Sequence, residues 1–115
     1  MKCAPVLRSL AFDGPQQVRV TLDLPATLPC FAGHFPGFPV LPGVVQIDWV
    51  MQLAAAHLRC AQRPAAEIRV KFKRVVTPGS PLGLTLRHDT ARQRLAFTYT
   101  IGDSVASQGQ IMLPP

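Results

Sequence analysis

The sequence predicts an α+β fold in which one long helix packs against an antiparallel sheet. Residues 44–63 contain neither proline nor glycine and are enough for about five helical turns. The segments that follow alternate apolar and polar residues, with turn residues between them, as is typical of consecutive antiparallel strands. At 115 residues the chain is expected to form one domain, residues 1–115, with a single core.

Five strands are expected. The first, at residues 18–24, alternates apolar and polar side chains and therefore has one buried face. The other four follow the helix, at residues 67–73, 82–87, 94–101 and 105–113. Because only short turn segments separate the last three, they are expected to pair with one another as an antiparallel meander on the helix.

A proline-rich loop connects the first strand to the helix. Five of the chain's 12 prolines stand within eighteen residues, from Pro25 to Pro42. This density excludes a regular helix or a central strand from the segment. Gly43 then opens the helix, and Pro64 lies just past its end.

The helix is expected to be buried on all sides. Apolar residues cover nearly its whole circumference, and such a helix is normally enclosed by the rest of the fold. These residues are Val44, Val45, Ile47, Trp49, Val50, Met51, Leu53, Ala54, Ala55, Ala56 and Leu58. One curved sheet cannot enclose a helix completely, so we expect a second subunit to cover the rest, and hence a dimer.

Composition limits the chemistry that is available. The chain has 12 Lys and Arg, 6 Asp and Glu and three histidines, so few side chains can serve in acid–base catalysis. Cys3, Cys30 and Cys60 lie far apart, and no Cys or His pair has zinc-ligand spacing, so no metal site is expected. An odd number of dispersed cysteines favours a reducing compartment, with each cysteine acting as a small apolar residue.

The sequence shows no sign of a membrane span or a secretion signal. No apolar run approaches the ~18 residues that a membrane span needs. Pro5 and Arg8 interrupt the apolar stretch near the N-terminus, which makes it a poor signal peptide. The expected location is the cytoplasm.

Asp48 is the acidic residue of the apolar helix. A buried carboxylate must be paired, hydrogen-bonded or neutral, and desolvation favours its protonated form. Gln52, four residues on, lies on the same face and is placed to hydrogen-bond it. An alternative interpretation is an ordinary acidic residue stabilised by the helix dipole, and position alone favours neither.

His34 is the histidine with the most distinctive surroundings. It lies in the proline-stiffened loop, between glycines, and such a loop can hold a base rigidly, although a loop histidine is more often simply solvated. His57 is expected at a packed or interfacial position on the helix, and His88 in or beside a turn in solvent. Gly43 is either an ordinary glycine at a helix start or a backbone N–H donor that polarises a carbonyl oxygen.

These residues belong to one recognisable string. Residues 31–52 read Phe-Ala-Gly-His-Phe-Pro-Gly-Phe-Pro-Val-Leu-Pro-Gly-Val-Val-Gln-Ile-Asp-Trp-Val-Met-Gln. The string resembles the active-site segment of the 3-hydroxyacyl-acyl-carrier-protein dehydratases, the FabA/FabZ family. In that pattern, Gly-His-Phe-Pro-Gly and Pro-Val-x-Pro-Gly precede an acidic residue and a Gln on the helix. The spacing of fourteen from His34 to Asp48 matches.

Residues 72–82 resemble the strand and Pro-Gly turn that follow in this family, and the resemblance covers residues 15–113. The sequence at the helix start, Val-Val-Gln-Ile-Asp-Trp, is most similar to that of the small ApeI-type dehydratases of aryl-polyene biosynthesis. The resemblance implies a hotdog fold, in which an antiparallel sheet wraps the long helix. It also implies dimers with active sites at the subunit interface, as homodimers, heterodimers or higher oligomers.

The resemblance further implies a hydro-lyase reaction. His34 would remove the C2 proton of a 3-hydroxyacyl thioester, and Asp48 of the other subunit would protonate the departing C3 hydroxyl. The Gly43 N–H would hold the thioester oxygen, and the product would be a trans-2-enoyl thioester. A base and an acid on opposite sides of the C2–C3 bond address both the weakly acidic proton and the poor leaving group.

The implied substrate site is apolar and needs no metal or redox cofactor. Its lining would come from Phe35, Phe38, Val40 and Leu41, with Gln52 supporting Asp48. The acyl chain would arrive on the 4'-phosphopantetheine arm of an acyl carrier protein. An acidic residue of the Asp type resembles the branch that also isomerises trans-2 to cis-3 enoyl chains, whereas Val44 replaces the Cys of that branch, so both activities stay open.

The net charge of +6 raises the question of an acidic partner. Charged residues are few and aromatic residues sparse, which argues against nucleic acid. Six positive residues lie at the end of the predicted helix and along or just after the predicted strand at residues 67–73. The strand residues either form an ordinary solvated face, or the whole group recruits an acidic acyl carrier protein. The six residues are Arg59, Arg63, Arg69, Lys71, Lys73 and Arg74.

Two other functions remain as alternatives. The hotdog fold also hosts acyl thioesterases, although the Gly-His-Phe-Pro-Gly segment is a dehydratase signature. A non-catalytic subunit of a heterodimeric dehydratase is the second alternative, and the presence of both His34 and Asp48 argues against it.

Overall fold

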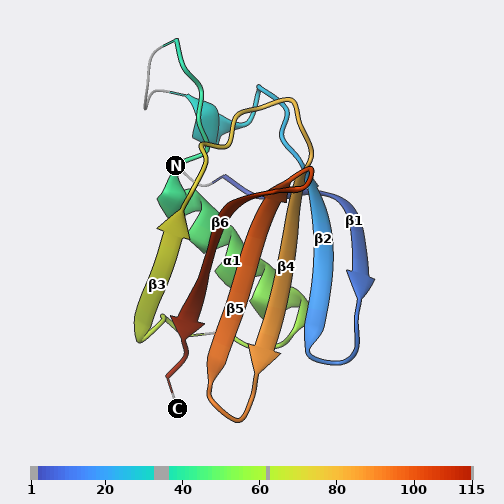
Figure 1. Cartoon of the computed structure of the whole chain (residues 1–115), viewed down its shortest axis with the longest axis vertical. Helices are drawn as coiled ribbons and strands as arrows, with labels where there is room; N and C mark the ends of the chain where they lie inside the picture. The colour runs from blue at the N-terminus through green and yellow to red at the C-terminus, as the bar shows by residue number, and fades with distance from the viewer. Residues whose placement is uncertain (1–2, 33–36, 62, 115) are drawn as a thin grey trace.

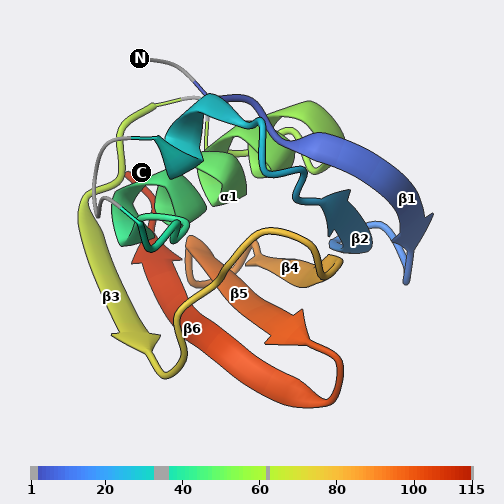
Figure 2. The ribbon, with the colours of Figure 1, turned by 90° about the horizontal axis from the view of Figure 1, so that it is seen from above.

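The strands of this protein form one sheet that curves around one helix (Figures 1 and 2). The structure, a computed structural model, describes residues 3–32, 37–61 and 63–114. In chain order the elements are β1 (Val6–Phe12), β2 (Gln17–Asp23), the 3-10 turn η1 (Pro29–Phe31), α1 (Gly43–His57), β3 (Glu67–Phe72), β4 (Leu82–Asp89), β5 (Arg94–Ile101) and β6 (Ser104–Met112). All strand pairs are antiparallel, in the order β1-β2-β4-β5-β6-β3.

The inner face of the sheet and the helix make the core. Alternation in β2, β4 and β5 places every second side chain against α1, as the period of a strand requires. The buried inner residues are Val18, Val20, Leu22, Leu82, Leu84, Leu86, Leu95, Phe97 and Tyr99. From the helix, Trp49, Val50, Leu53 and Ala54 meet them, which confirms the α+β prediction and gives the hotdog arrangement.

The sequence missed the first strand. β1 pairs with β2 and forms one edge of the sheet, with a register shift between Leu7 and Ser9. Most of its residues are exposed, and its sequence, Val-Leu-Arg-Ser-Leu-Ala-Phe, places apolar residues next to one another, so it has no period-two pattern. The five predicted strands are all present, within one or two residues at most of their ends.

The helix is shorter than predicted. It ends at His57 rather than Arg63, because the chain turns at the C-cap Leu58 and the Cys60 N–H donates to the Ala54 carbonyl at 3.4 Å. Arg59 lies in the left-handed region, with φ of 55°, as is common just after a helix end. Pro64 marked a boundary beyond which no helix could continue, not the place where this helix stops.

The helix is not buried on all sides within one chain. Val44, Asp48 and Gln52 follow one another at intervals of four and form an exposed stripe along α1. Val44 is 73% exposed. The sheet of the single chain curves around only the opposite side of the helix, as expected of one curved sheet (Figure 2). Coverage of the exposed stripe by a second subunit stays a prediction.

Two of the three cysteines are paired. Cys3 and Cys30 form a disulfide that joins the segment before β1 to η1, and Cys60 is free and buried. The expectation that all three are simply small apolar residues is wrong for this pair, since a separation of 27 residues in the sequence gave no sign of their proximity. Disulfides persist mainly in oxidising compartments, so the cysteines do not favour a reducing one. In the part of the chain that the structure describes, no helix is long and apolar enough to cross a membrane.

Candidate functional site

The loop that enters α1 is fixed from both sides. Pro42 is the N-cap, with extended backbone, and its carbonyl accepts from the Val45 and Gln46 N–H groups at 3.1 Å each. The Leu41 N–H donates to the Val76 carbonyl at 2.7 Å, and the Gln46 side-chain amide donates to the Leu41 carbonyl at 3.3 Å. Proline fixes φ at residue 42, so the start of the helix has little freedom left.

A cavity of about 380 Å³ opens at this helix start. Most of its lining is apolar, with two positive side chains from the segment after β3. The lining residues are Val40, Leu41, Pro42, Gly43, Gln46, Phe72, Lys73, Arg74 and Val75. The cavity thus brings together three of the predicted substrate-site residues, Val40, Leu41 and Gly43, with two of the predicted carrier-docking residues, Lys73 and Arg74.

Gly43 presents backbone to this cavity. A Cβ at this position would lie 2.5 Å from Cζ of Phe72, so a larger residue would displace the Phe72 ring. The first N–H groups of a helix have no acceptor within the helix and carry the positive end of its dipole. The cavity therefore combines an apolar wall with an N–H suited to a carbonyl oxygen or an anion.

Asp48 and Gln52 form a pair on the open side of α1. The Gln52 side-chain amide donates to an Asp48 carboxylate oxygen at 2.6 Å, as the spacing of four predicts. Both residues are exposed, and neither lines the cavity beside Gly43. Within one chain, then, the Asp48 carboxyl group faces outward.

Burial raises the pKa of the Tyr99 hydroxyl well above its ordinary value, and the nearby Asp48 charge adds to the shift.

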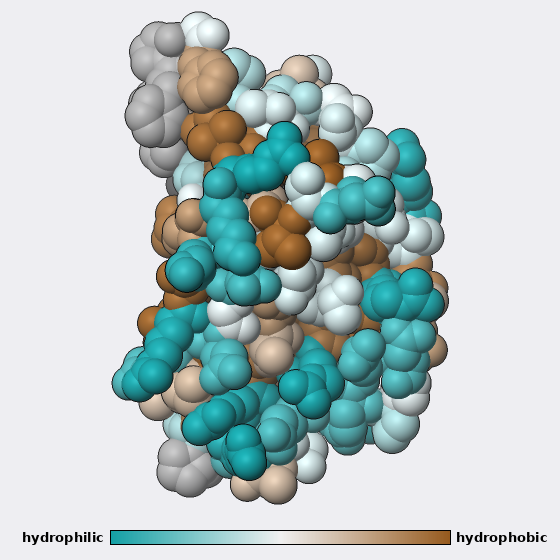
Figure 3. Space-filling view, in the orientation of Figure 1, coloured by the Kyte–Doolittle hydropathy of each residue, from teal (hydrophilic) through white to brown (hydrophobic). Residues whose placement is uncertain are grey.

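Two predicted site residues, His34 and Phe35, lie outside the described residues. Phe38 is described and is 54% exposed, and it is not part of the cavity lining. Figure 3 shows apolar surface at the end of the molecule where residues 37–42 lead into α1.

The predicted basic patch divides between two surfaces. Lys73 and Arg74 line the cavity at the helix start. Arg69 and Lys71 lie opposite Gln110 and Gln108 of β6, and Arg69 forms an ion pair with Glu67. The outer face of the sheet is mainly hydrophilic (Figure 3).

Sequence reasoning missed a buried polar network beneath the cavity. Gln46 is 3% exposed, and its side-chain oxygen accepts from the Ser107 hydroxyl at 2.8 Å. The Tyr99 hydroxyl donates to the Gln46 backbone carbonyl at 2.6 Å. A glutamine inside an otherwise apolar helix was the signal that could have revealed this network, because a buried amide requires partners.

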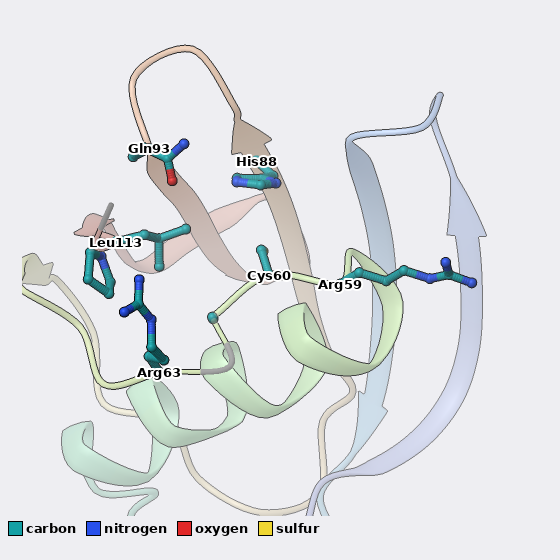
Figure 4. A pocket seen from close by; sticks show the side chains of 8 residues that line it. Arg59, Cys60, Arg63, His88, Gln93 and Leu113 are labelled. Carbon is teal, nitrogen blue, oxygen red and sulfur yellow. The ribbon is translucent and has the colours of Figure 1, made fainter.

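A second cavity, of about 210 Å³, lies at the other end of α1. Figure 4 shows His88, Gln93 and Arg63 around it, with the Arg59 side chain directed away. His88 lies near the end of β4, beside the turn at residues 90–93, as predicted. Its Nε2 is buried without a hydrogen-bond partner, so the expectation that it is solvated is wrong. Burial raises the pKa of the Cys60 thiol here. Among the described residues, no cluster of three or more His, Cys, Asp or Glu could hold a metal ion.

Two solved structures resemble this one over its whole length. The dehydratase heterocomplex ApeI:P from Xenorhabdus doucetiae superposes with a TM-score of 0.89 at 38% identity, covering 100% of both chains. An uncharacterised protein from Erwinia carotovora gives a TM-score of 0.77 at 37% identity, covering 100% of this chain and 98% of that one. Mouse thioesterase superfamily member 2, at 12% identity and a TM-score of 0.68, covers 90% of this chain and 77% of that one and shares the fold alone.

Sequence relatives lead to the same group of proteins. The 3-hydroxyacyl-[acyl-carrier-protein] dehydratase FabZ of Ralstonia nicotianae is 30% identical over 91% of this chain and 72% of its own length. FabZ of Syntrophomonas wolfei is 32% identical over 79% of this chain and 62% of its own length. Residues 12–110 match the family model described as ApeI-like, ApeI dehydratase. With an apolar cavity at the start of its central helix and a match over most of its length, this chain belongs to the ApeI-like family of FabZ-related hotdog dehydratases.

Proposed function

We propose that this protein removes water from 3-hydroxyacyl thioesters carried on an acyl carrier protein and produces trans-2-enoyl thioesters. The observation that carries the proposal is the apolar cavity into which the start of α1 opens, in a chain of a dehydratase family. The apolar wall suits an acyl chain, and the Gly43 N–H suits the thioester oxygen, where negative charge develops as the C2 proton leaves. The proposed compartment is the cytoplasm, which the family supports, whereas the Cys3–Cys30 disulfide is of a kind more common in oxidising compartments.

The proposed mechanism moves one proton at each carbon. His34, with a neutral imidazole, takes the proton from C2, and the electron pair that remains forms the C2–C3 double bond. Asp48, in its protonated form, gives its proton to the C3 hydroxyl, which leaves as water. The proton gained by His34 must return to Asp48 before the next turnover, so no net charge accumulates on the protein.

The outward position of Asp48 supports an active site shared between two copies. The stripe of Val44, Asp48 and Gln52 lies on the open side of α1, while β3 forms the free edge of the sheet opposite β1. Large apolar side chains are exposed on both α1 and β3. Val44 of α1 is 73% exposed, and Ile68 and Phe72 of β3 are 43% and 49% exposed. An exposed edge strand is a ready surface for pairing, and a second copy that covered it would also cover the helix stripe.

We predict that the purified protein is a dimer and that Ile68→Glu, which places a charge on the β3 edge, shifts it to the monomer. Size-exclusion chromatography with light scattering measures both. Arg87→Glu, on an exposed position of β4, is the matched control and keeps the dimer. A monomeric wild-type protein at micromolar concentration contradicts the homodimer. The solved ApeI:P relative is a heterocomplex, so gain of activity on adding a second hotdog subunit would support a heterodimer instead.

The basic residues near the cavity support docking of an acidic carrier. Lys73 and Arg74 line the cavity itself, and Lys71 precedes them on the edge strand. A carrier that delivers its phosphopantetheine arm to this cavity would bring its acidic surface close to these side chains. Complementary charge of this kind acts mainly on the rate of encounter.

Charge reversal at Lys71 and Lys73 is expected to lower kcat/KM for carrier-bound substrate by about tenfold, because steering by charge contributes to association. The effect on a carrier-free pantetheine thioester is expected to be much smaller. The loss should also shrink at high salt, since screening removes the steering in both proteins. The double variant Arg87→Glu/Arg92→Glu is the control for net charge, because it also reverses two exposed positive charges, and neither residue lines the cavity. Equal losses on the two substrates would exclude carrier docking at this patch.

Mass spectrometry of a 3-hydroxyacyl carrier thioester incubated with the protein tests the function directly. Dehydration is seen as loss of one water from the carrier-bound acyl chain. Release of free carrier thiol instead would support the thioesterase alternative.

A further inference from the structure

One row of the sheet holds the first turn of α1. Phe72 of β3, Ser107 of β6 and Tyr99 of β5 are cross-strand neighbours, with Ser107 paired to both of the others. The Phe72 ring lies against Gly43, and the Ser107 and Tyr99 hydroxyls each bond to Gln46. The helix start is therefore located by three residues from three strands.

Gln46 connects this row to the cavity wall. Its amide nitrogen donates to the Leu41 carbonyl, and its amide oxygen accepts from Ser107, so both ends of the side chain are engaged. The Leu41 N–H is bonded to Val76 as well. Both backbone polar groups of Leu41 are thus held, one by the segment after β3 and the other by Gln46.

Hydrogen bonds to the Pro42 and Leu41 carbonyls together determine the direction of the Gly43 N–H relative to the cavity wall. The carbonyl of Pro42 and the N–H of Gly43 belong to one planar peptide unit and point in opposite directions. That carbonyl is fixed by the N–H groups of Val45 and Gln46, and φ of Pro42 is fixed by its ring. Only the rotation between the Leu41–Pro42 and Pro42–Gly43 peptides remains, and the Gln46 amide limits it by holding the Leu41 carbonyl.

We propose that Gln46, which is oriented by Ser107, is a positioning residue. It holds the Val40–Leu41 wall of the cavity at a fixed position relative to the Gly43 N–H. An acyl chain that packs on this wall then presents its thioester oxygen to that N–H. The expected effect on kcat rests on the proposed function, whereas the positions of Gln46, Leu41 and Gly43 do not depend on it.

Gln46→Met tests the proposal, because methionine keeps the length of the side chain and removes both side-chain hydrogen bonds. We expect kcat for carrier-bound substrate to be lower by about 10- to 100-fold, since small displacements of an oxyanion donor are costly. KM should change by less than about threefold, because the apolar contacts that bind the chain remain. Ser107→Ala, which removes only the orienting bond, should show the same split to a smaller degree.

Trp49→Phe is the matched control. It also removes a buried side-chain hydrogen bond of α1, but one made to the Cys3 carbonyl and not to the loop that lines the cavity. It should keep kcat within about twofold at a comparable loss of thermal stability. Equal losses of kcat in the Gln46→Met and Trp49→Phe variants would mean that loss of any buried bond of α1 lowers kcat, and would overturn the proposal.

The amide resonance of Gly43 gives a readout that needs no substrate. In two-dimensional NMR spectra, Gln46→Met should shift this resonance, whereas Trp49→Phe should leave it in place. An unmoved Gly43 resonance in Gln46→Met overturns the positioning role even if activity is lost. A wild-type protein that leaves the 3-hydroxyacyl thioester intact overturns the proposed function, while the Gly43 comparison still decides the role of Gln46.

Discussion

Asp48→Asn and His34→Ala each lower kcat for dehydration of a 3-hydroxyacyl carrier thioester by about 10²- to 10⁴-fold, the range expected for loss of a general acid or base. Asparagine keeps the size of the side chain and an oxygen that can accept from Gln52, but it has no carboxyl proton to give. The change therefore removes the proposed chemistry with little change in packing. Steady-state kinetics on the carrier-bound substrate measures it.

Asp103→Asn is the matched control, since it removes one carboxylate from an exposed turn between β5 and β6. It should leave kcat unchanged. Full activity in both Asp48→Asn and His34→Ala would refute the assigned mechanism, and full activity in one of them would remove that residue from it.

Mixing the two inactive variants tests whether the site is shared. If His34 of one subunit works with Asp48 of the other, a mixed dimer holds one intact site and one doubly altered site. Random exchange then restores roughly a quarter of the wild-type activity, since half of the dimers are mixed and each has one working site of two. If both residues acted within the same subunit, no combination would restore any. The outward-facing Asp48 in the single chain favours restoration.

Trp49→Ala lowers the free energy of unfolding by about 3–5 kcal/mol, the usual cost of removing a fully buried large aromatic side chain. Trp49 has no exposed surface, lies on the buried side of α1, and donates from Nε1 to the Cys3 carbonyl at 2.6 Å. The substitution leaves a cavity between helix and sheet and deprives that carbonyl of its partner. A loss of this size is a large part of the stability of a small domain.

Trp49→Phe separates the two contributions, because it keeps most of the apolar volume and removes the indole N–H. It should cost clearly less than Trp49→Ala. Urea unfolding followed by circular dichroism, at one fixed protein concentration to hold any association constant, measures both. Equal unfolding free energies for the two variants would show that the ring volume does not support the core.

The sequence by itself determined the order and type of most elements and the identity of the family. Alternation predicted β2, β4 and β5 because their inner residues meet the helix and their outer residues meet solvent, and this contrast is what a period of two records. The Gly-His-Phe-Pro-Gly segment and the Pro-Gly start of α1 predicted the dehydratase family, since the motif spans enough residues to be specific. The pairing of Asp48 with Gln52 followed from helical spacing alone.

Only the tertiary structure decided which side of α1 is open, because apolar residues lie around nearly the whole helix and the curvature of the sheet selects the covered face. It also placed β1 at the edge, where few side chains are buried and no pattern is required. Ser107 meets Gln46 across 61 residues, and Cys3 meets Cys30 across 27. Such contacts depend on which segments the fold places side by side, and the local sequence around each residue does not predict that placement.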